Sequence, residues 1–165
     1  MIICGYPGIG KSTIAKSEDN VVDLESSIFR NDDGTKLEYW EEYYCKMAEH
    51  LSRQGHTVFV STHPEVLSYL RINCKEPVMC VYPAKDLKEE WIEKLKTRYE
   101  KSGTEKDRRA YISVEDNFDS QIDALSKIGF SRVEITRDKY QLSSLITWVE
   151  NWVDEFPSAR GFRIS

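Results

Sequence analysis

Glycines, a lysine and a serine lie close together near the start of the sequence. The segment reads Gly5-Tyr6-Pro7-Gly8-Ile9-Gly10-Lys11-Ser12, and Thr13 follows it. Glycines permit positive φ angles, which let successive backbone N–H groups turn inward around an anion. The lysine adds a positive charge, and a serine hydroxyl is an oxygen ligand of the kind that Mg²⁺ accepts. This spacing is the P-loop pattern, and it predicts a site for the phosphates of ATP together with Mg²⁺.

The residues of this segment differ in their expected roles. We expect Lys11 to contact the β- and γ-phosphates, Ser12 to bind the metal ion, and Thr13 to make an outer contact. The other members, Gly5, Tyr6, Pro7, Gly8, Ile9 and Gly10, supply the loop backbone around the nucleotide. The alternative is a chance glycine-rich turn, but the apolar run Ile2-Ile3-Cys4 before the loop and the helix-compatible residues after it favour the phosphate site.

Two acids lie at the exit of a second apolar run at residues 21–24. Asp23 and Glu25 are two positions apart, so strand alternation places both side chains on the same side. A carboxylate there could accept the proton of an acceptor hydroxyl or hold a water on Mg²⁺. Glu25, which is nearer to the loop, is the first candidate for the base. The alternative is a solvated strand end or a helix-capping acid.

Cationic side chains are candidates for contacts with the substrate and the transition state. Arg98, Arg108 and Arg109 lie where a mobile lid would close over the nucleotide and stabilise the transferring phosphoryl group. The alternative is that they only balance the glutamates of exposed helices. Arg30 could clamp an anionic acceptor, and His63 could meet the substrate after the third strand. An exposed helix-start arginine and an ordinary loop histidine are the alternatives for these two.

The hydrophobic pattern alternates between strands and helices along the whole chain. Short apolar runs predict strands at residues 2–4, 21–24, 57–60, 78–82 and 133–136. Apolar residues at three- and four-residue spacing predict helices at 11–16, 40–51, 64–70, 86–99, 118–128 and 142–153. The basic cluster at 106–109 falls in a hinge between two of these helices, and Trp40, Trp91, Trp148 and Trp152 fall on apolar helical stripes, which predicts a place in the core.

Strands that alternate with helices predict an α/β fold in which helices cover both faces of a parallel sheet. In such folds the sites lie at the carboxyl ends of the strands, so the chemistry should gather at residues 5–13, 23–27 and 61–64. A chain of 165 residues is expected to form one domain over 1–165.

Composition and charge limit the classes of function. No apolar run reaches the length of about 20 residues that a membrane span needs. The formal net charge of −5 disfavours binding to bulk nucleic acid. The start of the sequence has no basic leader and no apolar stretch of signal-peptide length, and the four cysteines are isolated, so we expect a cytoplasmic protein with reduced thiols.

The chain resembles the nucleoside-monophosphate-kinase-like branch of P-loop proteins, and it is similar to uncharacterised kinase-like proteins of bacteria and their phages. The residues that carry the resemblance are Gly5 to Thr13, Asp23-Leu24-Glu25, Ser61-Thr62-His63-Pro64 and the charged segment after the fourth strand. The resemblance implies a three-layer α/β/α fold with a five-stranded parallel sheet of order 2-3-1-4-5. It also implies a helical lid at about 98–116 and an acceptor pocket between Glu25, Arg30 and the exit of the third strand.

Three functions remain open at this point. The first is an ATP-dependent phosphotransferase that acts on a small-molecule or nucleotide acceptor with Mg²⁺. The second is a nucleotide-binding switch or slow ATPase, which is favoured because the strand at 57–60 has no aspartate at its end. The third is a kinase of the 5′-hydroxyl ends of nucleic acids, which fits a basic lid but not the acidic total. The phosphoryl acceptor and the oligomeric state are not encoded in any motif of the sequence.

Overall fold

A computed structural model describes residues 1–137 of the chain, and within them five strands form one parallel sheet. The strands are β1 (Ile2–Gly5), β2 (Val21–Asp23), β3 (Thr57–Val60), β4 (Val78–Pro83) and β5 (Ser131–Ile135). Their order across the sheet is β2-β3-β1-β4-β5, as expected. The register pairs Ile3 of β1 with Phe59 of β3 on one side and with Met79 of β4 on the other.

The helices connect these strands in the predicted order. They are α1 (Lys11–Ser17), α2 (Trp40–Arg53), α3 (Pro64–Asn73), α4 (Lys88–Ser102) and α5 (Glu105–Ser126). Two short 3₁₀ turns, η1 (Ser26–Ile28) and η2 (Lys85–Leu87), precede α2 and α4. Proline at the first position of α3 starts that helix without losing an intrahelical hydrogen bond, because the first amides of a helix have no partner inside it.

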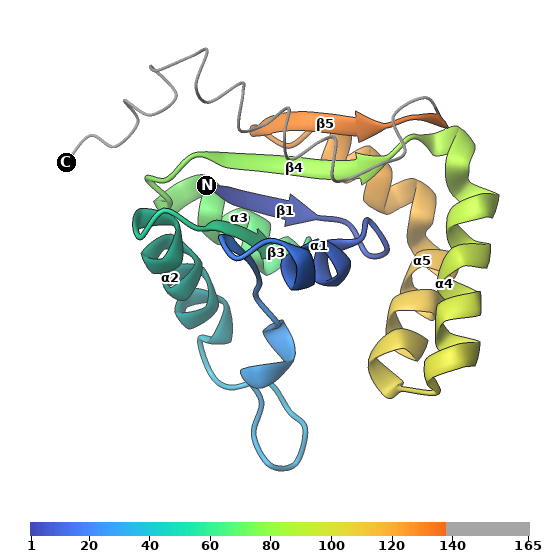
Figure 1. Cartoon of the computed structure of the whole chain (residues 1–165), viewed down its shortest axis with the longest axis horizontal. Coiled ribbons are helices and arrows are strands. Elements are labelled where there is room, and N and C mark those ends of the chain that lie inside the picture. Colours follow the sequence, from blue (N-terminus) through green and yellow to red (C-terminus); the bar gives the residue numbers. More distant parts are fainter. Residues whose placement is uncertain (138–165) are drawn as a thin grey trace.

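The connections place helices on the two faces of the sheet. The crossover from β1 through α1 to β2 runs in one direction across the sheet, whereas the later crossovers run in the other. Since crossovers between parallel strands are right-handed, α1 covers one face and α2, α3 and α5 cover the other. Figure 1 shows α4 and α5 as an antiparallel pair at the end toward which the strand arrows point, so this hairpin lies at the carboxyl edge of the sheet.

The core forms where the central strands are covered on both faces. All four residues of β1 and all four of β3 are buried, which explains why these strands read as continuous apolar runs instead of alternating ones. Helices α2, α4 and α5 contribute buried aromatic rings to the core, namely Trp40, Tyr44, Trp91 and Phe118. Trp40 and Trp91 are therefore core residues, as predicted, whereas Trp148, Trp152 and the predicted helix at 142–153 lie outside the described residues.

The structure corrects one boundary of the sequence analysis. The basic cluster of Lys106, Arg108 and Arg109 was predicted to lie in a hinge, but α5 begins at Glu105 and contains it. The break between α4 and α5 consists only of Gly103, with φ of 62°, and Thr104. Thr104 caps α5 because its side chain accepts a hydrogen bond from the Asp107 amide at 3.3 Å. The threonine cap and the acids in the first turn stabilise the start of a helix here, although the dense charges had suggested a loop.

Membrane-spanning helices, metal clusters and disulfides can each be looked for in residues 1–137. No helix within residues 1–137 is long and apolar enough to cross a membrane. The same residues hold no cluster of three or more His, Cys, Asp or Glu side chains arranged to bind a metal ion. None of the four cysteines, Cys4, Cys45, Cys74 and Cys80, forms a disulfide in the structure.

Candidate functional site

The glycine-rich loop leaves β1 at Gly5 and enters α1 at Lys11. Gly8 and Gly10 have φ angles of 87° and 96°, which other residues adopt only under strain. The first hydrogen bond of α1 runs from the Ile14 amide to the Gly10 carbonyl at 3.1 Å. The amides of Lys11, Ser12 and Thr13 thus precede the helical hydrogen-bond ladder. The loop has the backbone geometry that the sequence pattern predicted, with donors at its helical end.

Helices α4 and α5 hold this loop from behind. The indole Nε1 of Trp91 donates to the Pro7 carbonyl at 2.7 Å, and the Lys94 ammonium donates to the Gly8 carbonyl at 2.5 Å. The Tyr6 ring packs edge-to-face on a buried phenylalanine of α5, and its hydroxyl donates to Gln121 at 2.6 Å. These contacts bind two loop carbonyls and a loop side chain to α4 and α5, so both helices brace the loop.

The Lys11 ammonium lies in an unusual electrostatic environment. It donates to the Gly5 carbonyl at 2.6 Å, which folds the lysine back across the loop. Desolvation lowers the pKa of Lys11 to about 8, although the charges of Asp23 and Glu25 oppose this shift. Desolvation likewise raises the pKa of Asp23, and the charge of Lys11 partly offsets it. The predicted lysine and the predicted acids therefore lie close enough to perturb each other's ionisation.

A tyrosine of the helix that was predicted at 40–51 joins the exits of two strands. The Tyr44 hydroxyl of α2 donates to the Leu24 carbonyl at 2.8 Å and accepts from the Ser61 amide at 2.9 Å. Leu24 and Ser61 follow β2 and β3 directly. The ring is fully buried, so this hydroxyl links the exits of β2 and β3, which lie on the same side of β1 and its glycine-rich loop. No sequence signal distinguishes it from a core tyrosine.

The predicted lid residues are held by ion pairs near the tip of the α4–α5 hairpin. Lys106 of α5 forms an ion pair with Glu25, and the Nε of Arg98 lies 2.9 Å from Asp107. The Lys106 contact joins the hairpin to the exit of β2. Glu25, the first candidate for the base, is therefore occupied by a lysine that the sequence analysis had not paired with it.

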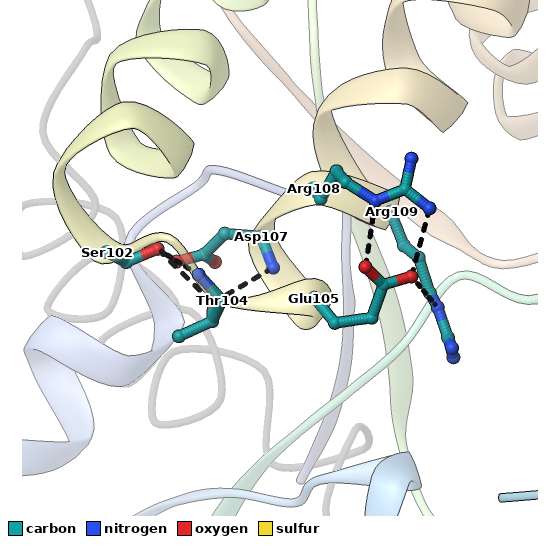
Figure 2. A network of polar contacts seen from close by, with 6 residues as sticks. All are labelled: Ser102, Thr104, Glu105, Asp107, Arg108 and Arg109. Carbon is teal, nitrogen blue, oxygen red and sulfur yellow. Dashed lines mark hydrogen bonds and ion pairs between the residues drawn. The ribbon is translucent and has the colours of Figure 1, made fainter.

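The two remaining lid arginines bind a residue of their own helix. Figure 2 shows Arg108 and Arg109 both joined to the carboxylate of Glu105, with Nε to carboxylate distances of 2.8 and 2.9 Å. These hydrogen bonds lower the pKa of Glu105 to about 2. In this conformation the two arginines balance the charge of a glutamate on their own helix, which was the alternative to a role in the lid. Arg98 and Lys106 are instead the cations whose charges act on Lys11 and Asp23.

The two predicted substrate residues lie apart from each other. Arg30 belongs to the loop between η1 and α2, which protrudes from the body in Figure 1, and it donates to the Gly34 carbonyl at 2.6 Å. His63 lies after β3, where its Nδ1 is 2.7 Å from the Ser61 hydroxyl and its ring meets Trp40 edge-to-face at 5.7 Å. Desolvation lowers the pKa of His63. Of the two, His63 borders the open space beside the glycine-rich loop.

That space is an open cavity of about 460 Å³. Gly5, Pro7 and Lys11 of the glycine-rich loop line one end of it. Residues 61–64 after β3 line it next, and it then continues between α3 and α5. Glu25 and Arg30 do not line it, so this cavity differs from the acceptor pocket that the resemblance implied. Its position beside Lys11 leaves room for a second molecule next to bound phosphates.

Comparisons with known proteins identify the fold of this chain. No family model and no curated protein matches the chain. Among solved structures, the crystal structure of shikimate kinase from Bacteroides thetaiotaomicron is similar over 93% of this chain and 97% of that chain. The TM-score is 0.51 and the sequence identity is 12%. At this identity the likeness shows the fold alone. The chain has the α/β P-loop fold of that kinase, with the sheet order described above.

Proposed function

We propose that the chain is an ATP-dependent phosphotransferase that acts on a small-molecule or nucleotide acceptor. In this proposal it is a kinase of the nucleoside-monophosphate-kinase-like branch of P-loop proteins. One observation carries this proposal: the cavity of about 460 Å³ opens directly beside Lys11 of the glycine-rich loop. A protein that only holds a nucleotide does not need space for a second molecule at the phosphate end. The fold that the chain shares with a shikimate kinase supports the same function.

The transfer itself would follow the usual course of a P-loop kinase. The hydroxyl oxygen of the acceptor forms a bond to the γ-phosphorus, the bond from that phosphorus to the β–γ bridging oxygen breaks, and ADP leaves with the electron pair. The acceptor proton passes to a carboxylate. We assign this role to Asp23 instead of Glu25, because desolvation raises the pKa of Asp23 and makes it the stronger base, whereas Glu25 forms an ion pair with Lys106.

The loop and its neighbours would hold the donor nucleotide. The backbone from Gly5 to Thr13 surrounds the phosphates, and the Lys11 ammonium moves from the Gly5 carbonyl to the β- and γ-phosphate oxygens. Arg98 and Lys106, whose charges already act on Lys11, approach the transferring group when the α4–α5 hairpin closes as a lid over residues 98–116. Arg108 and Arg109 join them only if their contacts with Glu105 break.

The residues present fit a Mg²⁺ ion that is bound mainly by phosphates. Ser12 is exposed at the start of α1, and Asp23 and Glu25 lie at the end of β2. Magnesium usually binds to one or two protein oxygens, to phosphate oxygens and to water, so the lack of a three-residue metal cluster among residues 1–137 is compatible with it. When bound, the ion neutralises charge on the phosphates. A single domain in the cytoplasm, where ATP is available and thiols stay reduced, completes the proposal.

The test is ADP formation from Mg·ATP in the presence of a panel of acceptors. The panel contains nucleosides, nucleoside monophosphates, small hydroxylated metabolites and oligonucleotides with 5′-hydroxyl ends. We expect at least one small acceptor to stimulate ADP formation by the wild type and to have no effect on Lys11→Ala. Stimulation only by oligonucleotides would instead assign the end-kinase function.

A second function has one specific observation in its favour. Strand β3 ends at Val60 and is followed by Ser61 and Thr62, so no carboxylate stands at the strand end where many P-loop enzymes bind Mg²⁺ through an acid. A nucleotide-binding switch or a slow ATPase tolerates this loss. Tight nucleotide binding by the wild type with no response to any acceptor would favour the switch over the kinase.

A further inference from the structure

We propose that the groove between α3 and α5 binds the acceptor as an organic anion, with its carboxylate or phosphate on Arg71 and its hydroxyl near Lys11. This inference deepens the proposed function and depends on it for the role of the hydroxyl end. The groove itself is the continuation of the cavity beside the glycine-rich loop. Its occupant is a small molecule because the cavity of about 460 Å³ has the size of a small-ligand site.

Each wall of the groove is one face of a helix. Helix α3 contributes Pro64, Leu67, Ser68 and Arg71, which have the spacing of a single helical face. At 1.5 Å per residue, Pro64 and Arg71 are about 10 Å apart along the axis. Helix α5 and its end contribute the matching series of Gln121, Ala124, Leu125 and Ile128. The groove is therefore elongated, with the glycine-rich loop at one end and Arg71 at the other.

The cationic side chains of the groove, Lys11 and Arg71, favour an anion, whereas desolvation lowers the pKa of His63 and favours its neutral form. Lys11, His63 and Arg71 are the titratable side chains that line it, and no carboxylate does so within the described part of the chain. Arg71 has no ion-pair partner among residues 1–137, although the chain as a whole carries a net charge of −5. An arginine is well suited to a carboxylate or a phosphate because its planar guanidinium offers paired donors. The lining of the groove is therefore positively charged, whereas the chain as a whole is negatively charged.

The section between the two cationic ends is apolar, and the section beside the loop has a fixed polar wall. Leu67, Ala124 and Leu125 line the middle. Near the loop, Gln121 accepts from the Tyr6 hydroxyl at 2.6 Å and donates to the Ser113 hydroxyl at 3.1 Å. These bonds hold the amide of Gln121 in one orientation toward the groove. The arrangement fits a molecule with an anionic head, a short apolar middle and a hydroxyl at the other end.

The experiment measures ligand binding and turnover separately. The probes are a graded series of linear hydroxycarboxylates, the corresponding hydroxyalkyl phosphates, and hydroxyamides of matched length that lack the anion. Binding is measured without nucleotide, as a saturable rise in the melting temperature. Turnover is measured as ADP formation with Mg·ATP. We expect the anionic probes to bind and the amides not to bind, and the better anionic series identifies the head group.

Two substitutions and their controls locate the site. Arg71→Gln should weaken binding of the anionic probes, and raise their KM in turnover, about 10- to 100-fold, the effect of losing a charge-assisted hydrogen bond. Lys75→Gln removes an exposed cation that follows the end of α3 and does not line the groove, and it should leave both values unchanged. Ser68→Phe fills the exposed middle of the groove and should abolish binding, whereas Ile72→Phe, at an exposed position of α3 that does not line the groove, should not.

The outcomes separate this inference from the proposed function. Anion binding that depends on Arg71, without any turnover, supports the groove as an anion site and counts against the kinase. Turnover that is unaffected by both Arg71→Gln and Ser68→Phe supports the kinase and overturns the groove. The absence of any saturable shift of the wild type with the anionic probes also overturns it.

Discussion

The pH dependence of nucleotide binding follows from the environment of Lys11. Its pKa is about 8 in the free protein, because desolvation disfavours the ammonium. Phosphate oxygens favour the charged lysine, so a bound nucleotide raises this pKa. The affinity is consequently highest below pH 8, where Lys11 is already protonated. It falls as the pH rises, because binding must then take up a proton.

The size of the effect follows from the fraction of charged lysine. With a pKa of about 8, Lys11 is about 90% charged at about pH 7 and about 10% charged at about pH 9. If only the charged form binds tightly, the dissociation constant of ATP rises about tenfold between these two pH values. This corresponds to about 1.4 kcal/mol. Above pH 7 the nucleotide phosphates no longer titrate, so the change reports on the protein.

The assay is titration calorimetry or displacement of a fluorescent ATP analogue at constant ionic strength, from about pH 7 to about pH 9.5. Lys11→Arg is the matched control, since a guanidinium keeps its charge across this range. We expect the step near pH 8 in the wild type and a flat profile in Lys11→Arg. A flat wild-type profile, or a step that persists in Lys11→Arg, would refute the reasoning.

Two further predictions concern residues that hold the site in place. Tyr44→Phe removes the hydroxyl that accepts from the Ser61 amide, and it should lower the free energy of unfolding by about 1–3 kcal/mol in urea denaturation, whereas the exposed Tyr43→Phe should change it little. Trp91→Phe removes the hydrogen bond to the Pro7 carbonyl. It should weaken ATP binding several-fold in calorimetry, because the loop loses its brace, and unchanged affinity would contradict that role.

The arrangement of the sheet was largely predictable from the sequence. Buried parallel strands appear as continuous apolar runs, so residues 57–60 gave the bounds of β3, and the glycine-rich loop marked the end of β1. The sheet order came from the resemblance, and the structure confirms it. The start of α5 was harder to predict, because a dense run of charges is compatible with either a loop or an exposed helix. Only the Thr104 cap distinguishes the helix from the loop.

The candidate site was predictable only where local chemistry defines it. The conformation of the glycine-rich loop follows from its glycines, and the positions of the acids at the end of β2 followed from strand alternation. The roles of Tyr44 and Trp91 could not be predicted from the sequence. Their ring carbons are buried like those of any core aromatic, and only their polar atoms reach the loops. The contacts that join distant elements, such as Lys106 to Glu25 across 81 positions, are likewise set by tertiary structure alone.

The central claim is that a phosphoryl group passes from ATP to an acceptor in the cavity beside Lys11. Its most direct test is to incubate the wild type with ATP labelled at the γ-phosphate and the acceptor panel, and to separate labelled acceptor from labelled inorganic phosphate. We predict label on a small hydroxylated acceptor, and none with Lys11→Ala. Release of all the label as inorganic phosphate, at a rate that no acceptor changes, would contradict the account.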